Sequence, residues 1–176
     1  MERLADCVIL PPGPADADDL ARVHIAAWRE TYAGLLPDGY LAAMNTKVHA
    51  RRWRVQLTRA RAGEVVLAAE GAGGLVGYCA GAVGGGEAEI FTLYLLRAVQ
   101  RTGLGRRLLE AAARGLAGQG ATSLRLWVLN ANHPARGFYE RHGGRVAGER
   151  PVRGWGGHLM ETAYRWEDIG GVGCKV

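Results

Sequence analysis

Several features are scarce in this 176-residue sequence, and each absence removes a class of protein. There are three cysteines, Cys7, Cys79 and Cys174, and they lie far apart and outside any metal-ligand spacing. This favours a reducing compartment over a disulfide framework, and we expect no metal site. No apolar run approaches the length of a membrane span, and MERLADCVIL lacks the basic-then-apolar order of a signal peptide. We therefore expect a cytoplasmic protein with no membrane partner.

An extreme charge balance is also missing. The net charge is +5, carried mostly by arginine, and the hydrophobic content of 48% is that of an ordinary globular protein. The arginines read as scattered along the chain with no interleaved aromatic platform, so a solvated basic face is favoured over a nucleic-acid surface. No convincing linker or repeat is present. We expect one domain over residues 1–168 and a flexible C-terminal tail at 169–176.

Apolar periodicity predicts a mixed α/β fold. After Asp16, the spacing of Leu20, Val23 and Ala27 indicates an amphipathic helix that ends near Gly34. Further helices are predicted from Pro37, from Thr46 as a cap, from residue 104 to Gly118 or Gly120, and from Pro134; strands are predicted over 7–10, 64–70, 75–83, 87–96, 123–129, 145–149 and 158–166. The result is a mixed sheet of about seven strands flanked by about four or five helices.

The stretch QRTGLGRRLLE (100–110) combines two glycines with the start of a predicted helix. A helix start offers unpaired N–H groups and the positive end of the dipole, and glycine allows close approach, so the stretch is a candidate phosphate cradle. Tight helix–strand packing is the alternative. There is no Gly-Lys-Ser/Thr, and Arg106 follows Gly105 with no third glycine in register. These two absences exclude a nucleotide-hydrolysing P-loop and a dinucleotide-binding motif.

The surrounding sequence, EAEIFTLYLLRAVQRTGLGRRLLEAAARGL, resembles the central motif of the GNAT superfamily of N-acetyltransferases, with Gln100, Gly103 and Gly105 at its motif positions. Downstream, LRLWVLNANHPARGFYERHGG (124–144) resembles the next part of that family. The matching positions there are Asn132, Ala135, Phe138 and Tyr139. Upstream, HIAAWRETYAGLLPDGYL (24–41) resembles the acceptor-side helices of a bacterial branch. Departures are Arg97 for a frequent proline, Arg101 for a frequent glycine, and Gly143-Gly144 without an aromatic residue. The likeness implies a small single-domain acyl-CoA N-acyltransferase fold.

The resemblance implies acetyl-CoA as the acetyl donor. Its pyrophosphate would meet the backbone N–H groups of residues 101–106, and its pantetheine arm would lie along the preceding strand as an added strand would. The residues implied to bind it are Leu93, Leu95, Gln100, Arg101, Thr102, Gly103, Leu104, Gly105, Arg106 and Asn132. Asn132 equally serves as a helix cap. Arg97, Arg101, Arg106 or Arg136 would meet the outer phosphates, unless each is simply solvated.

Two residues carry the implied catalysis. Tyr139 occupies the family's position for the acid that protonates the departing thiolate, and a tyrosine pKa of about 10 suits that task. Its alternative role is packing beside Phe138. Glu89 matches a base that deprotonates the amine in some members; strand alternation places it on one face with Phe91 and Leu93. The alternative for Glu89 is a charge at the sheet edge that pairs with a cation or with solvent.

The acceptor side is less defined. Trp28 and Tyr32 lie on the segment that usually shapes the acceptor pocket, where an aromatic pair would clamp an alkyl ammonium, or they belong to the core. His24 would line that pocket or pack. No long acidic groove for a basic peptide is evident, so a small primary amine is favoured as acceptor for a monomeric or homodimeric enzyme. A protein N-terminal or lysine acetyltransferase and a catalytically silent acyl-CoA sensor are the alternatives.

Overall fold

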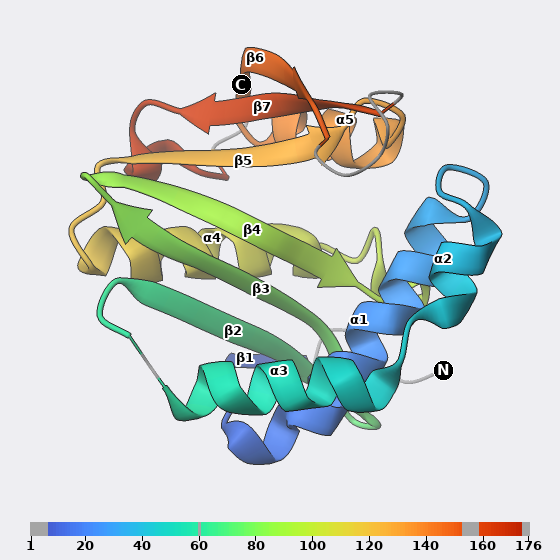
Figure 1. Ribbon diagram of the computed structural model, residues 1–176. Coiled ribbons are helices and arrows are strands. Elements are labelled where there is room, and N and C mark those ends of the chain that lie inside the picture. Colours follow the sequence, from blue (N-terminus) through green and yellow to red (C-terminus); the bar gives the residue numbers. More distant parts are fainter. Residues whose placement is uncertain (1–6, 60, 153–158, 174–176) are drawn as a thin grey trace.

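The computed structural model describes residues 7–59, 61–152 and 159–173 and contains a seven-stranded sheet in the order β1-β2-β3-β4-β5-β7-β6 (Figure 1). The strands are β1 (Val8–Leu10), β2 (Glu64–Gly71), β3 (Gly74–Gly84), β4 (Glu87–Leu95), β5 (Ser123–Leu129), β6 (Arg145–Pro151) and β7 (Met160–Trp166). The helices are α1 (Ala17–Tyr32), α2 (Asp38–Ala43), α3 (Thr46–Thr58), α4 (Leu104–Gly118) and α5 (His133–Arg141). The mixed α/β fold expected from periodicity is confirmed.

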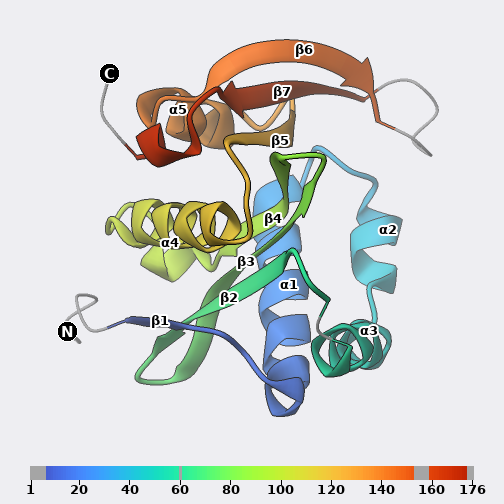
Figure 2. The ribbon, with the colours of Figure 1, turned by 90° about the vertical axis from the view of Figure 1, so that its left-hand side faces the viewer.

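Helices cover the sheet on two sides because their apolar residues recur every three or four positions (Figure 2). On one side, α4 buries Leu104, Leu108 and Leu116 against the strands. On the other, Leu20 of α1 and Trp53 of α3 share a core with residues of β2 and β3. Among the described residues, no helix combines the length and hydropathy that a membrane crossing requires.

The sheet opens between β4 and β5, its only parallel pair. Their register runs from Glu87 opposite Ser123 to Ile90 opposite Leu126, and beyond that point the two strands separate. A β-bulge lies at the same place on β4: Ile90 and Thr92 pair with consecutive residues of β3, and Phe91 is the extra residue. A bulge bends its strand, and this one directs the second half of β4 away from β5.

The bulge also reverses which face each β4 residue occupies. Ile90 and Leu95 are five positions apart, yet both belong to the core beneath α4, and Leu93 packs against that core. Tyr94 packs on the opposite side, against the core shared by α1 and α3. The prediction that Glu89 shares a face with Leu93 is therefore wrong, because one inserted residue shifts the two-residue alternation.

Two element ends also differ from expectation. Asn45 rather than Thr46 caps α3: its side-chain oxygen accepts hydrogen bonds from two N–H groups of the first turn, and its backbone is extended as a cap requires. Past residue 168 the chain does not loosen at once, because Ile169 and Val172 are buried in the core beneath α4. Residues 174–176 of the expected tail, and His158 of the expected last strand, lie outside the described residues.

Candidate active site

The start of α4 presents a run of unpaired backbone N–H groups. Gly103 immediately precedes the helix with φ of 88°, a left-handed conformation that side-chain-bearing residues rarely adopt. The first N–H to bond back is that of Arg107, which donates to the Gly103 carbonyl at 3.1 Å. Within the described residues, no N–H from 101 to 106 donates to a protein oxygen. Six unpaired donors thus lie in and just before the first turn of α4, at the positive end of its dipole, where an anion is favoured.

Side chains fix this loop from within. The Gln100 amide donates to the Leu95 carbonyl at 3.0 Å, and the Thr102 hydroxyl donates to the Val99 carbonyl at 2.8 Å. Gln100 and Thr102, two of the predicted cofactor-binding residues, therefore use their side chains to hydrogen-bond the backbone of the loop itself. Their placement holds the backbone in the shape that exposes its N–H groups.

The two glycines of the loop have different tasks. A Cβ on Gly103 would meet no atom within 4 Å, so this position needs glycine for its backbone angle alone. A Cβ on Gly105 would lie 3.4 Å from the side chains of both Leu95 and Phe138, so this position allows α4 to approach β4 and α5 closely. Packing explains the glycine at 105, and the backbone angle that a cradle would use explains the glycine at 103.

The second half of β4 has a free edge. Leu93 and Leu95 pair with Cys79 and Gly77 of β3 on one side. On the other side the ladder with β5 stops at Ile90, so within the described residues the β5-facing backbone of 91–95 has no strand partner. Such an edge accepts an extended chain that carries amide groups. It lies beside the α4 start, because Leu95 packs against both Leu104 and Gly105.

Tyr139 lies on the inner face of α5 at this opening. Its ring is buried against Trp166 and Tyr164, with centroid distances of 6.2 and 6.0 Å. Its hydroxyl makes no hydrogen bond within the described residues. Burial raises the pKa of Tyr139 above its usual range, and the nearby Cys79 and Tyr32 raise it further. The hydroxyl is consequently protonated at neutral pH, which is the state that a proton donor needs.

Asn132 precedes α5, and its side-chain oxygen accepts a hydrogen bond from the Ala135 N–H at 3.2 Å. The capping role considered for this residue is therefore present. Capping positions Asn132 at the β5-side wall of the opening and uses its oxygen, while its amide nitrogen has no partner within the described part of the chain.

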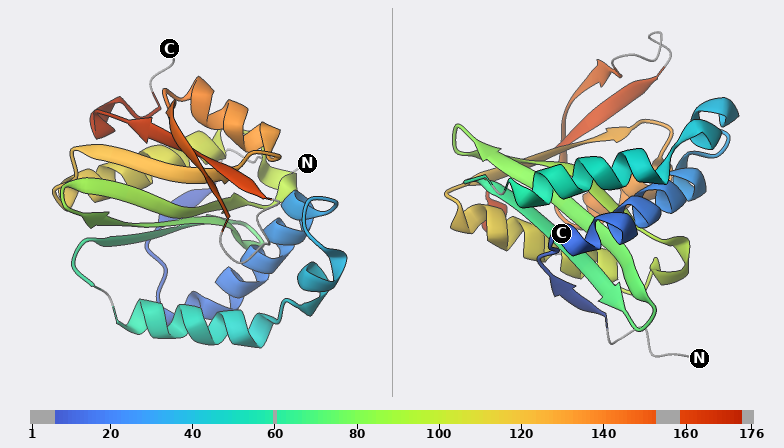
Figure 3. Two further views of the ribbon diagram at one scale, coloured as in Figure 1. Left: turned by 45° about the horizontal axis from the view of Figure 1, so that its top comes forward. Right: turned by 60° about the horizontal axis from the view of Figure 1, so that its bottom comes forward.

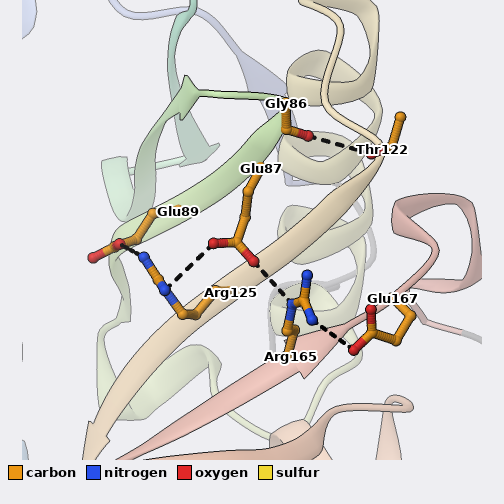
Figure 4. A network of polar contacts seen from close by, with 7 residues as sticks. All are labelled: Gly86, Glu87, Glu89, Thr122, Arg125, Arg165 and Glu167. Atoms are coloured by element: carbon orange, nitrogen blue, oxygen red, sulfur yellow. Dashed lines mark hydrogen bonds and ion pairs between the residues drawn. The ribbon is translucent and has the colours of Figure 1, made fainter.

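Glu89 belongs to an ion-pair network at the closed end of the β4–β5 ladder (Figure 4). Its carboxylate lies 2.9 Å from the Arg125 guanidinium, and Arg125 also lies 3.3 Å from Glu87. Glu87 continues to Arg165 at 2.9 Å, and Arg165 to Glu167 at 2.8 Å. The network links β4, β5 and β7. Glu89 therefore pairs with a cation, as one alternative held, but it does so on the central strand of the sheet and not at the sheet edge, and it lies across the bulge from Leu93.

Trp28 and Tyr32 belong to an aromatic cluster on the acceptor side. Their rings lie 4.9 Å apart at a steep angle, and the Tyr32 hydroxyl lies 3.0 Å from the Tyr94 hydroxyl of β4. Tyr40 of α2 stands at the exposed rim, 6.2 Å from the Trp28 ring. The Trp28 indole N–H is buried with no hydrogen-bond partner within the described chain. Tyr94 thus connects the acceptor-side cluster to the strand that borders the opening.

His24 pairs with a tyrosine that sequence inspection did not identify. Its Nδ1 lies 2.5 Å from the Tyr78 hydroxyl, and its ring lies 5.3 Å from Trp28. Burial, together with the neighbouring His49 and Arg52, lowers the His24 pKa to about 4. The imidazole is therefore neutral at physiological pH. The sequence does not single out Tyr78 or Tyr94, because each occupies a position typical of an apolar strand residue. The two tyrosines are neighbours because the register between β3 and β4 pairs them.

The four arginines considered for the outer phosphates are not equivalent. Arg136 donates to the Tyr164 hydroxyl and to the Asn130 carbonyl, and Arg106 lies 2.7 Å from Glu110. The side chains of Arg97 and Arg101 have no partner within the described residues. Arg101 additionally has φ of 61°, unusual for a residue with a side chain. Arg97 and Arg101 are the two free cations closest in sequence to the loop.

Comparison with known proteins places this arrangement among acetyltransferases. The model of the acetyltransferase (GNAT) family matches residues 25–144. The uncharacterized N-acetyltransferase YuaI of Bacillus subtilis is 31% identical over 159 residues, which cover 88% of this chain and 89% of that protein. The probable N-acetyltransferase Rv2775 of Mycobacterium tuberculosis is 27% identical over 90% of this chain and 84% of its own length.

Solved structures share the fold. PaiA N-acetyltransferase from Thermoplasma acidophilum, crystallised with coenzyme A, superimposes with a TM-score of 0.77 at 21% identity, over 91% of this chain and 98% of that one. YncA, a putative acetyltransferase from Salmonella typhimurium solved with acetyl-CoA, superimposes with a TM-score of 0.71 at 20% identity, over 93% and 94% of the two chains.

Proposed function

Since this chain belongs to the GNAT family of acetyltransferases, we propose that it moves the acetyl group of acetyl-CoA to the primary amine of a small molecule. One observation carries the cofactor assignment. The unpaired N–H groups at the start of α4 lie beside the unpaired backbone edge of β4. An anion cradle next to a free strand edge suits a ligand that has a pyrophosphate and an amide-bearing arm.

The chain's own groups divide the binding task. The N–H groups of residues 101–106 would hold the pyrophosphate, and Arg97 and Arg101 supply positive charge nearby. The backbone of Leu93 and Leu95 would pair with the amides of the arm, and the Asn132 amide would meet the arm from the β5 side. Acetyl-CoA supplies the activated thioester; the protein orients it between β4 and β5.

Catalysis then requires a proton donor for the thiolate and a neutral amine. We assign the donor to Tyr139, whose hydroxyl is protonated at neutral pH and makes no competing hydrogen bond within the described chain. Glu89 is the base suggested by family resemblance. Its carboxylate is occupied by Arg125, so we favour a role in joining β4 to β5, with the amine entering as its neutral form.

These two roles of Glu89 are separable with Glu89→Gln and Arg125→Gln. If the pair only joins strands, each variant should lower kcat about threefold or less, because exposed ion pairs contribute about 0–1 kcal/mol, and the double variant should be no worse than either. Steady-state kinetics as a function of pH provides the measurement. A fall of about a hundredfold in Glu89→Gln alone, with loss of the acid limb of the pH profile, would restore Glu89 as the base.

The acceptor assignment rests on the aromatic cluster of Trp28, Tyr32 and Tyr94, which offers apolar surface and ring faces to an alkyl amine. A panel of small amines, peptides with free N-termini and lysine peptides should be incubated with acetyl-CoA and assayed for free thiol. We expect thiol release with small amines and little with peptides. Preference for peptides would point to protein modification. Binding of coenzyme A without thiol release from any acceptor would indicate a sensor.

A further inference from the structure

The positive charge of this protein is concentrated in one segment. Residues 39–63 contain no aspartate or glutamate and six basic residues: Lys47, Arg51, Arg52, Arg54, Arg59 and Arg61. The chain has 22 lysines and arginines, so the other 16 are set against 17 acidic residues, and the remainder is slightly negative. The prediction that the arginines are scattered is thus wrong, because the excess of basic over acidic residues falls in one segment. The whole excess lies on α3 and the turn that follows it.

The fold displays this segment on the outside of the molecule. Ala50 and Trp53 form the inner face of α3 and are buried beside α1, so the helix turns its other face away from the sheet (Figure 3). That outer face borders a groove of about 560 Å³, lined by Val48, Arg51, Arg52, Val55, Gln56, Arg59, Arg61 and one acidic residue, Glu64. The groove lies away from the opening between β4 and β5.

Most of the charge in the groove is uncompensated. Arg61 has a distant partner in Glu64 at 4.0 Å. Arg51, Arg52 and Arg59 have no carboxylate partner within the described residues. Lysines and arginines on a helix are commonly balanced by acids three or four positions away, and α3 contains no acid to do so. Bringing an anionic partner here would relieve repulsion among like charges.

The groove also exposes apolar surface. Val48 and Val55 are 49% and 46% exposed and lie one heptad apart, about 10 Å along the helix. Proteins bind single-stranded nucleic acid by combining phosphate contacts with aromatic stacking, and no aromatic residue lines this groove. Valines flanked by arginines instead suit a polypeptide that presents acidic side chains around two apolar ones.

We propose that the outer face of α3 is a docking surface for an acidic, amphipathic segment of a partner protein. The arginines pair with its carboxylates, and Val48 and Val55 receive its apolar side chains. No residue of the α4 loop, β4 edge or α5 lines this groove, although the charge of Arg52 also acts on His24 of the acceptor side. Loss of docking at the other arginines would therefore leave acetylation of a free amine unchanged.

Fluorescence anisotropy at physiological ionic strength tests the proposal with three labelled probes: a glutamate-rich peptide with two leucines one heptad apart, an all-glutamate peptide of equal length, and single-stranded RNA of equal charge. We expect the leucine peptide to bind most tightly. Arg51→Gln/Arg59→Gln should weaken it about tenfold. Val48→Ser/Val55→Ser should weaken it about fivefold and leave the all-glutamate peptide unaffected.

A matched control is Arg114→Gln/Arg145→Gln, which removes the same charge from exposed positions on α4 and β6 and should change affinity less than about twofold. Circular dichroism and turnover of a free amine confirm that every variant is folded. The proposal fails if the control weakens binding equally, if the leucine peptide does not bind, or if RNA binds most tightly and ignores the valine pair. The last result would identify a nucleic-acid surface.

Discussion

Tyr139→Phe is expected to lower kcat about a hundredfold while the Kd for coenzyme A and the melting temperature stay near wild type. The substitution removes only the hydroxyl, and its loss deprives the departing thiolate of a proton donor. Because that hydroxyl has no hydrogen-bond partner in the described chain, its removal leaves no other group unsatisfied. Steady-state kinetics, calorimetric titration with coenzyme A and thermal unfolding measure the three quantities.

Tyr164→Phe is the matched control, because its ring lies 6.0 Å from that of Tyr139 and its hydroxyl is used differently. It donates to the Glu140 carboxylate at 2.6 Å and accepts from Arg136 at 3.2 Å. Its loss should lower the melting temperature and leave kcat near wild type, the opposite pattern. Equal turnover in Tyr139→Phe and wild type would remove Tyr139 from the acid role.

Gly103→Val is expected to weaken coenzyme A binding at least about tenfold. A β-branched residue at φ of 88° costs about 1–3 kcal/mol, so the loop would relax to a backbone that no longer aims its N–H groups together. No steric clash contributes, since a Cβ here meets open space. Calorimetric titration separates this loss of affinity from any change in turnover.

The conformational origin of the effect predicts a graded series. Asparagine tolerates the left-handed region better than alanine, so Gly103→Asn should bind coenzyme A more tightly than Gly103→Ala, and Gly103→Val least tightly. Gly118→Val, at the far end of the same helix, lacks both a positive φ and a nearby atom and should bind normally. Affinity unchanged across the series would mean that the α4 loop does not hold the pyrophosphate.

Element identity was predictable from the sequence because each segment's periodicity matches the face it buries. Leu104, Leu108 and Leu116 recur at helical spacing, and all three are buried on the face of α4 that packs against the sheet. SLRLWVL alternates, and β5 covers the same seven residues, Ser123–Leu129. Local patterns of this kind need no knowledge of distant parts of the chain.

The site was predictable only where it depends on local backbone. The two glycines of the α4 loop allowed its conformation to be predicted. The face on which Glu89 lies depends on a β-bulge in β4, and the sequence of β4 carries no signal for that bulge. That bulge requires close approach of β3: a Cβ on Gly81 would lie 2.6 Å from the Glu89 carbonyl oxygen. The partners of His24 and Tyr32 likewise come from strands more than fifty residues away.

The order of the strands has a consequence for biosynthesis. Among the described residues β7 follows β5 and β6 in the sequence, yet it lies between them in the sheet and forms an antiparallel pair with each. Tyr139 packs on Tyr164 and Trp166, which both belong to β7. During translation, β5, α5 and β6 leave the ribosome before β7, so β5 and β6 have no strand to pair with at this position until residue 166 has emerged. The tyrosine that we propose as the acid therefore reaches its packing partners only after β7 has been translated.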